Sequence, residues 1–189
     1  LIFNLRGLKD WLNLLIVKAD HKAGLWKLDD PWIGCKSLLE LYQKCGSPTG
    51  NRATVPALID PRGKDNQNPK LLGNESAQLV ETLSEWPTNK ETPNLAPQSL
   101  KKEIKDWQDL LQPFVNDGVY RCGFARNQSA YNKASQDLFN ALDHVENSLT
   151  DKGPWLCGDQ LTLADIRLFP TLIRWEVVYM PLFGCSQKP

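Results

Sequence analysis

The sequence predicts an α/β domain followed by an all-helical domain, and three observations support this division. Over the first 86 residues, apolar runs rich in strand formers alternate with amphipathic helical patterns. Residues 87–98, PTNKETPNLAPQ, carry three prolines and almost no large apolar side chains, which is typical of a linker. Residues 99–189 show helical periodicity throughout. We therefore expect domains at 1–86 and 99–189.

The first domain begins with Leu1, Leu5 and Leu8 at helical spacing, as though within an element, so we expect further chain in front of it. Five elements are then expected. They are a strand within 12–19, a helix at 37–46 that ends on a glycine, a strand within 52–60, a short strand at 70–72 and a helix at 75–86. This order fits a thioredoxin-like α/β domain that lacks its first strand.

Three apolar stripes indicate the main helices of the second domain. The first stripe consists of Leu100, Ile104, Trp107, Leu111, Phe114 and Val115; the second consists of Tyr131, Ala134, Leu138, Leu142, Val145 and Leu149. The third lies on a helix expected over residues 166–178, in which Pro170 should cause a kink.

The residues that precede this third stripe predict the N-terminus of a helix. Thr162 can cap the helix while Asp165, three residues on, bonds back to the amide of the cap, which makes a capping box. Leu161 and Ile166 can form the matching hydrophobic staple. This pattern is a folding signal, and we assign it no chemistry.

The composition is that of an ordinary globular protein, with 41% hydrophobic and 23% charged residues. The 22 basic and 22 acidic residues balance, and no basic block predicts a nucleic-acid partner. No apolar run approaches the roughly 18 residues of a membrane span, and no signal peptide is recognisable, so we expect a cytoplasmic protein without membrane contact. Five cysteines without a Cys-x-x-Cys pair, and two histidines away from them, predict neither disulfides nor a metal site.

Four segments, taken in order, resemble the glutathione transferase superfamily, and most closely its Xi class, the glutathionyl-hydroquinone reductases. They are RATVPALID followed by GNES, VNDGVYRCGFARNQSAYNKA, WLCGDQ with LTLADIRLF, and the stretch ending in RWEVVYMPLF. The resemblance implies that the second domain is the helical C-terminal domain of a glutathione transferase, in which the capping box starts the core helix. It also implies glutathione as co-substrate, quinone-derived small molecules as the other ligands, and a homodimer.

The resemblance assigns a glutathione site to the first domain. The proline of Val55-Pro56 is then cis, so that the backbone of Val55 turns outward and pairs with the cysteinyl part of the tripeptide, although an edge-strand proline without a ligand is the plain alternative. Glu75 and Ser76, at a helix N-terminus, hold the γ-glutamyl group, or else simply cap that helix. The implied glutathione-binding residues are Trp26, Arg52, Ala53, Thr54, Val55, Glu75 and Ser76. Trp32 lies close to Trp26 in the sequence and is the alternative for its role.

Two tyrosines of the second domain resemble catalytic tyrosines of the Xi class. Tyr120 matches the proton donor or acceptor at the quinone, where a neutral phenol can stabilise charge that develops on the leaving hydroquinone. Tyr179 matches a tyrosine that bonds the catalytic thiolate and favours that form. Without the resemblance, both have the pattern of ordinary half-buried tyrosines, as do Tyr42 and Tyr131.

The catalytic Cys-Pro-Trp-Ala motif of the class does not occur in these 189 residues. We expect it just before Leu1, and we expect further helices after the last residues. The implied function is a glutathione-dependent reductase or transferase of glutathionyl-hydroquinones, with no turnover by these residues alone because the nucleophile is absent. The alternative is a non-catalytic module of transferase type that binds glutathione or a protein.

Overall fold

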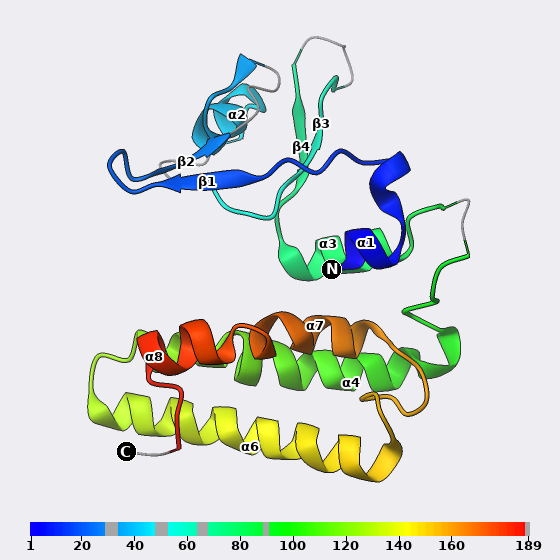
Figure 1. Ribbon diagram of the computed structural model, residues 1–189, viewed down its shortest axis with the longest axis vertical. Helices are drawn as coiled ribbons and strands as arrows, with labels where there is room; N and C mark the ends of the chain where they lie inside the picture. Colours follow the sequence, from blue (N-terminus) through cyan, green and yellow to red (C-terminus); the bar gives the residue numbers. More distant parts are fainter. Residues whose placement is uncertain (29–33, 48–52, 64–67, 89–90, 188–189) are drawn as a thin grey trace. The chain divides into compact units, whose positions relative to one another are not determined.

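The computed structural model divides into two compact units, and each is described by itself (Figure 1). It describes residues 1–28, 34–47, 53–63, 68–88 and 91–187. One unit, Arg6–Thr88, is α/β, and the other, Leu1–Leu5 with Asn89–Pro189, is helical. The predicted order of an α/β part followed by a helical part is therefore confirmed.

The chain begins with two short helical segments, as the leucine spacing predicts. Helix α1 spans Ile2–Leu5, and the 3-10 turn η1 spans Leu8–Asp10. Contacts group residues 1–5 with the helical unit, whereas η1 belongs to the α/β unit.

The first strands of the α/β unit form an antiparallel hairpin. Strand β1 (Val17–Asp20) pairs with β2 (Leu25–Leu28), so that Val17 lies opposite Leu28. The Asp20 carboxylate accepts the first amides of the intervening turn, and Gly24 supplies its left-handed residue at φ +65°. Strand β2 was not predicted, because its four residues do not alternate cleanly between apolar and polar side chains.

A second antiparallel hairpin joins β3 (Leu58–Asp60) to β4 (Lys70–Gly73). Helix α2 (Leu38–Lys44) begins at a Ser37 cap and is followed by Gly46 in the left-handed conformation. Both hairpins pack against this helix. The core consists of Leu28, Cys35, Leu38, Leu41 and Tyr42, with Val17, Cys45, Ala53, Ala57, Ile59 and Leu71 around it. Helix α3 (Ser76–Ser84) follows β4 directly, as predicted.

In its described residues, the helical unit contains four α-helices of six residues or more, together with shorter α-helical, 3-10 and π-helical segments. In chain order its elements are η3 (Gln98–Leu100), α4 (Lys101–Leu111), the π-helical η4 (Gln112–Asn116), α5 (Gly118–Gly123), α6 (Gln128–Lys152), α7 (Leu163–Leu172), the π-helical η5 (Trp175–Tyr179) and α8 (Met180–Phe183). Helix α4 packs on α7, and α5 packs on α6 and α8 (Figure 1).

The predicted apolar stripes of α4 and α6 face the core of this unit. Ile104, Trp107, Leu111 and Val115 are buried, and so are Ala134, Leu138 and Val145. The predicted linker, residues 87–98, is partly packed against the helical unit. Its Leu95 is buried, and the Leu95 carbonyl accepts a hydrogen bond from the amide of Leu163 at 2.8 Å.

The capping box at the start of α7 is confirmed. Asp165 Oδ2 accepts the Thr162 amide at 2.9 Å, and the Thr162 hydroxyl accepts the Ala164 amide at 3.3 Å. The prediction of one continuous helix over 166–178 is wrong, because α7 ends at Leu172 and η5 begins at Trp175. Pro170 cannot donate an amide hydrogen bond, and the regular helix stops within three residues of it.

Candidate functional site

Two groups of predicted site residues are found, one in each unit. In the α/β unit, the Val55-Pro56 peptide bond is cis, as the resemblance implies, and Val55 is 50% exposed. The segment that precedes Val55 is fixed by contacts with the core of the unit. Ala53 packs on the core, and the buried Tyr42 donates its hydroxyl to the Thr54 carbonyl at 2.8 Å. Above this support, Val55 lies at the surface.

The start of α3 lies beside this segment. Asn74 Nδ2 donates to Thr54 Oγ1 at 3.4 Å, which joins the turn before α3 to the segment before Pro56. Glu75 is the N-cap and Ser76 the first helical residue, and both side chains are exposed. The positive end of a helix and its free amides attract carboxylates, so this surface can accept an anionic group.

The remaining predicted glutathione-binding residues are only partly placed. Trp26 lies on β2 opposite Ala19, with 41% of its surface exposed. Arg52 lies outside the described residues, as does the nearby Trp32. The structure therefore brings Thr54, Val55, Glu75 and Ser76 to one surface of the unit.

In the helical unit, the two predicted tyrosines form a pair. The hydroxyls of Tyr120, on α5, and Tyr179, on η5, lie 3.4 Å apart, and their rings meet edge to face at 5.8 Å. Tyr179 is 2% exposed whereas Tyr120 is 42% exposed. Tyr120 can therefore meet a ligand directly, with the Tyr179 hydroxyl behind it.

Two phenylalanines that the sequence analysis did not single out complete this aromatic cluster. The ring of Phe183 lies 5.5 Å from Tyr120 and 5.8 Å from Tyr179, and Phe124 stacks on Tyr120 at 6.4 Å. Phe124 is 71% exposed, so the cluster offers an aromatic surface beside a phenolic hydroxyl. Phe183 stands 63 positions after Tyr120 in the chain, and no short motif links the two.

The buried member of the pair is a neutral hydrogen-bonding group. Burial, together with the hydrogen bond to Tyr120, raises the pKa of Tyr179 to about 12. The guanidinium carbon of Arg174 lies 5.7 Å from the centre of the Tyr179 ring and opposes that rise in pKa. At neutral pH the Tyr179 phenol therefore keeps its proton, and its hydroxyl can donate a hydrogen bond to the Tyr120 oxygen or accept one from it.

None of the five cysteines has the environment of an activated nucleophile. All are free thiols, and only Cys45 is more than marginally exposed. Desolvation raises the pKa of Cys45, Cys122 and Cys157, and it raises the pKa of Cys185 to about 12. A thiol must ionise to attack, so these thiols are poor candidates for that role at neutral pH.

The described ranges hold neither a metal-binding cluster nor a membrane-spanning helix. No cluster of three histidine, cysteine or carboxylate side chains there could hold a metal ion. No helix within those ranges has the length and apolar character needed to cross a membrane.

Comparisons with known proteins agree with the two-unit architecture. Residues 128–186 match the family "Glutathione S-transferase, C-terminal domain". Over 97% of its length the chain is 34% identical to the glutathionyl-hydroquinone reductase PcpF of Sphingobium chlorophenolicum, and it spans 60% of that protein.

Solved structures extend the similarity to the whole chain. The glutathione-bound structure of YqjG from Escherichia coli K-12 superposes over 98% of this chain and 62% of its own, with a TM-score of 0.86 and 29% identity. Glutathione transferase Xi 1 from Trametes versicolor superposes over 99% of this chain and 67% of its own, with a TM-score of 0.85 and 32% identity. The predicted fold class, a thioredoxin-like domain followed by a transferase-type helical domain, is confirmed.

Proposed function

Because the chain belongs to the Xi class of the glutathione transferases, we propose that it supplies the glutathione-binding and quinone-binding surfaces of a glutathionyl-hydroquinone reductase. The observation that carries this proposal is the hydroxyl pair of Tyr120 and Tyr179, which puts a proton donor at an exposed aromatic surface. The chain spans about three fifths of PcpF, and the complete reaction needs a thiol that these residues do not provide.

The reaction proposed for the complete protein is thiolysis. A cysteine thiolate attacks the glutathionyl sulfur, a sulfur–sulfur bond forms, and the carbon–sulfur bond to the ring breaks. The electron pair of that bond passes to the ring, which takes up a proton and leaves as the hydroquinone. A second glutathione then frees the cysteine and departs in glutathione disulfide. Tyr120 hydrogen-bonds the ring oxygen where negative charge develops, and the neutral Tyr179 supports it.

We assign the glutathione itself to the surface around Val55 and the start of α3. The backbone of the half-exposed Val55 pairs with the cysteinyl residue, while Ser76 donates to the γ-glutamyl carboxylate and Glu75 accepts from its ammonium. Trp26, Arg52, Ala53 and Thr54 are proposed to lie along the rest of the tripeptide. Tyr42 and Asn74 position this surface through their bonds to Thr54.

Titration of glutathione into the 189-residue chain by calorimetry tests this assignment. Ser76→Ala and Glu75→Gln should each weaken binding by about fivefold, because the first removes a hydrogen bond to a carboxylate and the second removes the negative charge that pairs with the ammonium. Glu85→Gln makes the same charge change at the other end of α3 and should leave the affinity unchanged. Equal affinities for all four proteins, or no binding by any, would contradict the assignment.

The role of Tyr120 is tested in a protein that carries these residues together with the Cys-Pro-Trp-Ala motif. Tyr120→Phe should lower the rate of hydroquinone release by about tenfold, since one hydrogen bond to developing charge is lost, with glutathione affinity unchanged. Tyr131→Phe removes a phenolic hydroxyl whose partner is the Gly184 carbonyl, and it should keep the rate. An unchanged rate in Tyr120→Phe would rule out the proton role. The thiolate role of Tyr179 stays a prediction.

A second candidate function is a non-catalytic module that binds glutathione or a protein. The raised pKa values of four of its thiols favour this alternative for the chain on its own. Glutathione binding without any turnover, once the cysteine motif is joined to the chain, would support it. We further propose a cytoplasmic homodimer, on the strength of the family resemblance and the balanced charge.

A further inference from the structure

Arg174 is a cation fixed beside the tyrosine pair, and the sequence analysis did not single it out. Its Nε donates to the Pro170 carbonyl at 2.6 Å, and its guanidinium lies over the Tyr179 ring at 5.7 Å. Within the described part of the chain its side chain forms no ion pair, although Glu176 is only two residues away. Among the described residues, no carboxylate pairs with the charge of Arg174.

The break between α7 and η5 explains why the side chain takes this position. Arg174 stands in the connection, with φ −98° and ψ 0°, after the regular helix has ended at Leu172. The Nε bond folds the side chain back towards the preceding turn. Arginine presents five N–H donors in a planar fork, so a bond at Nε leaves the two terminal amino groups to bind an anion.

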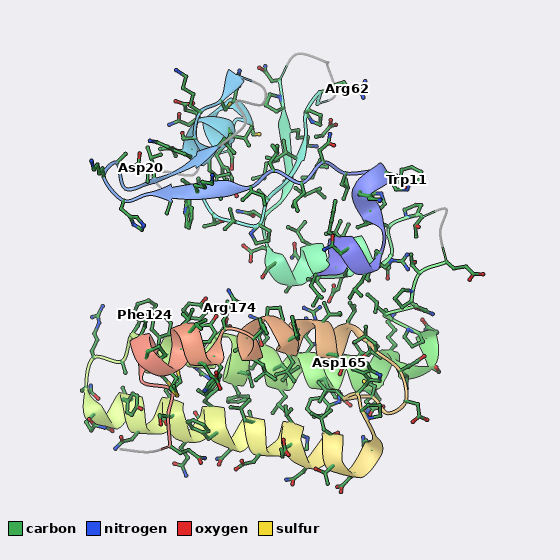
Figure 2. All side chains as sticks on the ribbon, viewed as in Figure 1. Trp11, Asp20, Arg62, Phe124, Asp165 and Arg174 are labelled. Carbon is green, nitrogen blue, oxygen red and sulfur yellow. The ribbon has the colours of Figure 1, made fainter. Side chains whose placement is uncertain are left out.

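Arg174 and the aromatic cluster lie on one side of the helical unit. Figure 2 shows Arg174 and Phe124 on the same side of the helical unit, at its upper edge in that view. Phe124 stacks on Tyr120, and Tyr120 meets Tyr179, over which the guanidinium lies. The aromatic surface of Phe124 and the cation of Arg174 therefore each contact a member of the tyrosine pair, Phe124 through Tyr120 and Arg174 through Tyr179.

We propose that Arg174 and Tyr120 together bind the oxygen of an aryl oxyanion, so that this face of the helical unit selects phenolates over neutral phenols. The aromatic ring of the ligand lies against Phe124, Tyr120 donates to its oxygen, and the guanidinium compensates its charge. Arg174 thereby becomes a specificity-determining residue: it favours hydroquinones that bind as monoanions. This step rests on the proposed function, which places the ring oxygen of the substrate at the tyrosine pair.

The test uses 4-nitrophenol and the 189-residue chain, with neither glutathione nor a reactive thiol present. The phenol and phenolate forms of this probe differ in visible absorption, so both binding and ionisation are read directly. The wild-type chain should bind the phenolate about fivefold more tightly than the phenol, which lowers the apparent pKa of the bound probe. Arg174→Gln should lose that preference, and Arg174→Lys should keep part of it.

The chain offers a closely matched control. Arg121 also lies over an aromatic ring, that of Phe114 at 5.6 Å, and also donates to a proline carbonyl, that of Pro113. Arg121→Gln removes the same charge from a side chain that lies over Phe114 rather than over a tyrosine, and it should leave the phenolate preference unchanged. Matching circular dichroism spectra and melting curves would show that the variants are folded.

Three results would overturn the inference: no binding of the probe by the wild-type chain, an undiminished phenolate preference in Arg174→Gln, or an equal loss in Arg121→Gln. The reductase proposal would survive each of them, because the probe undergoes no chemistry with glutathione. Conversely, an unchanged rate in Tyr120→Phe would rule out the proton role of Tyr120 in the reductase and leave phenolate binding by Arg174 standing.

Discussion

Asp165→Ala is expected to lower the free energy of unfolding of the helical unit by about 3 kcal/mol. The carboxylate accepts three hydrogen bonds: Oδ1 from the Leu156 amide at 2.9 Å, and Oδ2 from the Thr162 amide at 2.9 Å and from the Thr162 hydroxyl at 3.1 Å. Leu156 and Thr162 are both fully buried. Water cannot replace the lost acceptor easily, so two backbone amides would be left without partners.

Urea unfolding followed by circular dichroism measures this effect. The chain has two compact units, so the transition that belongs to the helical unit must be fitted separately. Asp165→Asn should also be destabilised, because its side-chain NH2 group is a hydrogen-bond donor and would replace one of the two oxygens that accept hydrogen bonds here. Asp143→Ala, at an exposed position within α6, should change stability by less than about 0.5 kcal/mol. A similarly small change in Asp165→Ala would show that the capping box contributes little.

Gly123→Ala should destabilise the same unit by about 2 kcal/mol and disturb the tyrosine pair. A Cβ atom at Gly123 would lie 2.6 Å from Cδ1 of Phe183 and would also overlap the root of that ring. Phe183 contacts both Tyr120 and Tyr179, so its displacement changes the surroundings of the two hydroxyls. Gly123 has no left-handed backbone conformation, and the expected loss therefore comes from packing.

Unfolding in urea and the near-ultraviolet circular dichroism of the aromatic cluster would show both effects. Gly118→Ala is the matched control on the same helix, because its Cβ would meet Leu138 Cδ1 at an ordinary 3.5 Å. Combining Gly123→Ala with Phe183→Leu should restore part of the stability, since the smaller side chain relieves the overlap. Equal stabilities for Gly123→Ala and wild type would mean that the ring moves aside without cost.

Much of the fold could be predicted because its signals are local. The capping box of Thr162 and Asp165 lies within four residues. Helix α2 likewise ends just before Gly46, the glycine that terminates it. The apolar stripes of α4 and α6 repeat at helical spacing, so burial of one face follows from the sequence. Strand β2 escaped prediction because it is short and depends on pairing with β1.

For the candidate site, too, some features follow from the sequence and others depend on tertiary contacts. The sequence by itself determined the α/β and helical parts, most of their elements, the cis proline and the residue types of the site, the last two through family resemblance. Only the tertiary structure decided that Tyr120 and Tyr179, 59 positions apart, share a hydrogen bond, and that Phe183 packs on Gly123. It also decided that the helix breaks after Leu172 and leaves Arg174 over the Tyr179 ring. Such contacts depend on how helices pack, and no local spacing in the sequence encodes them.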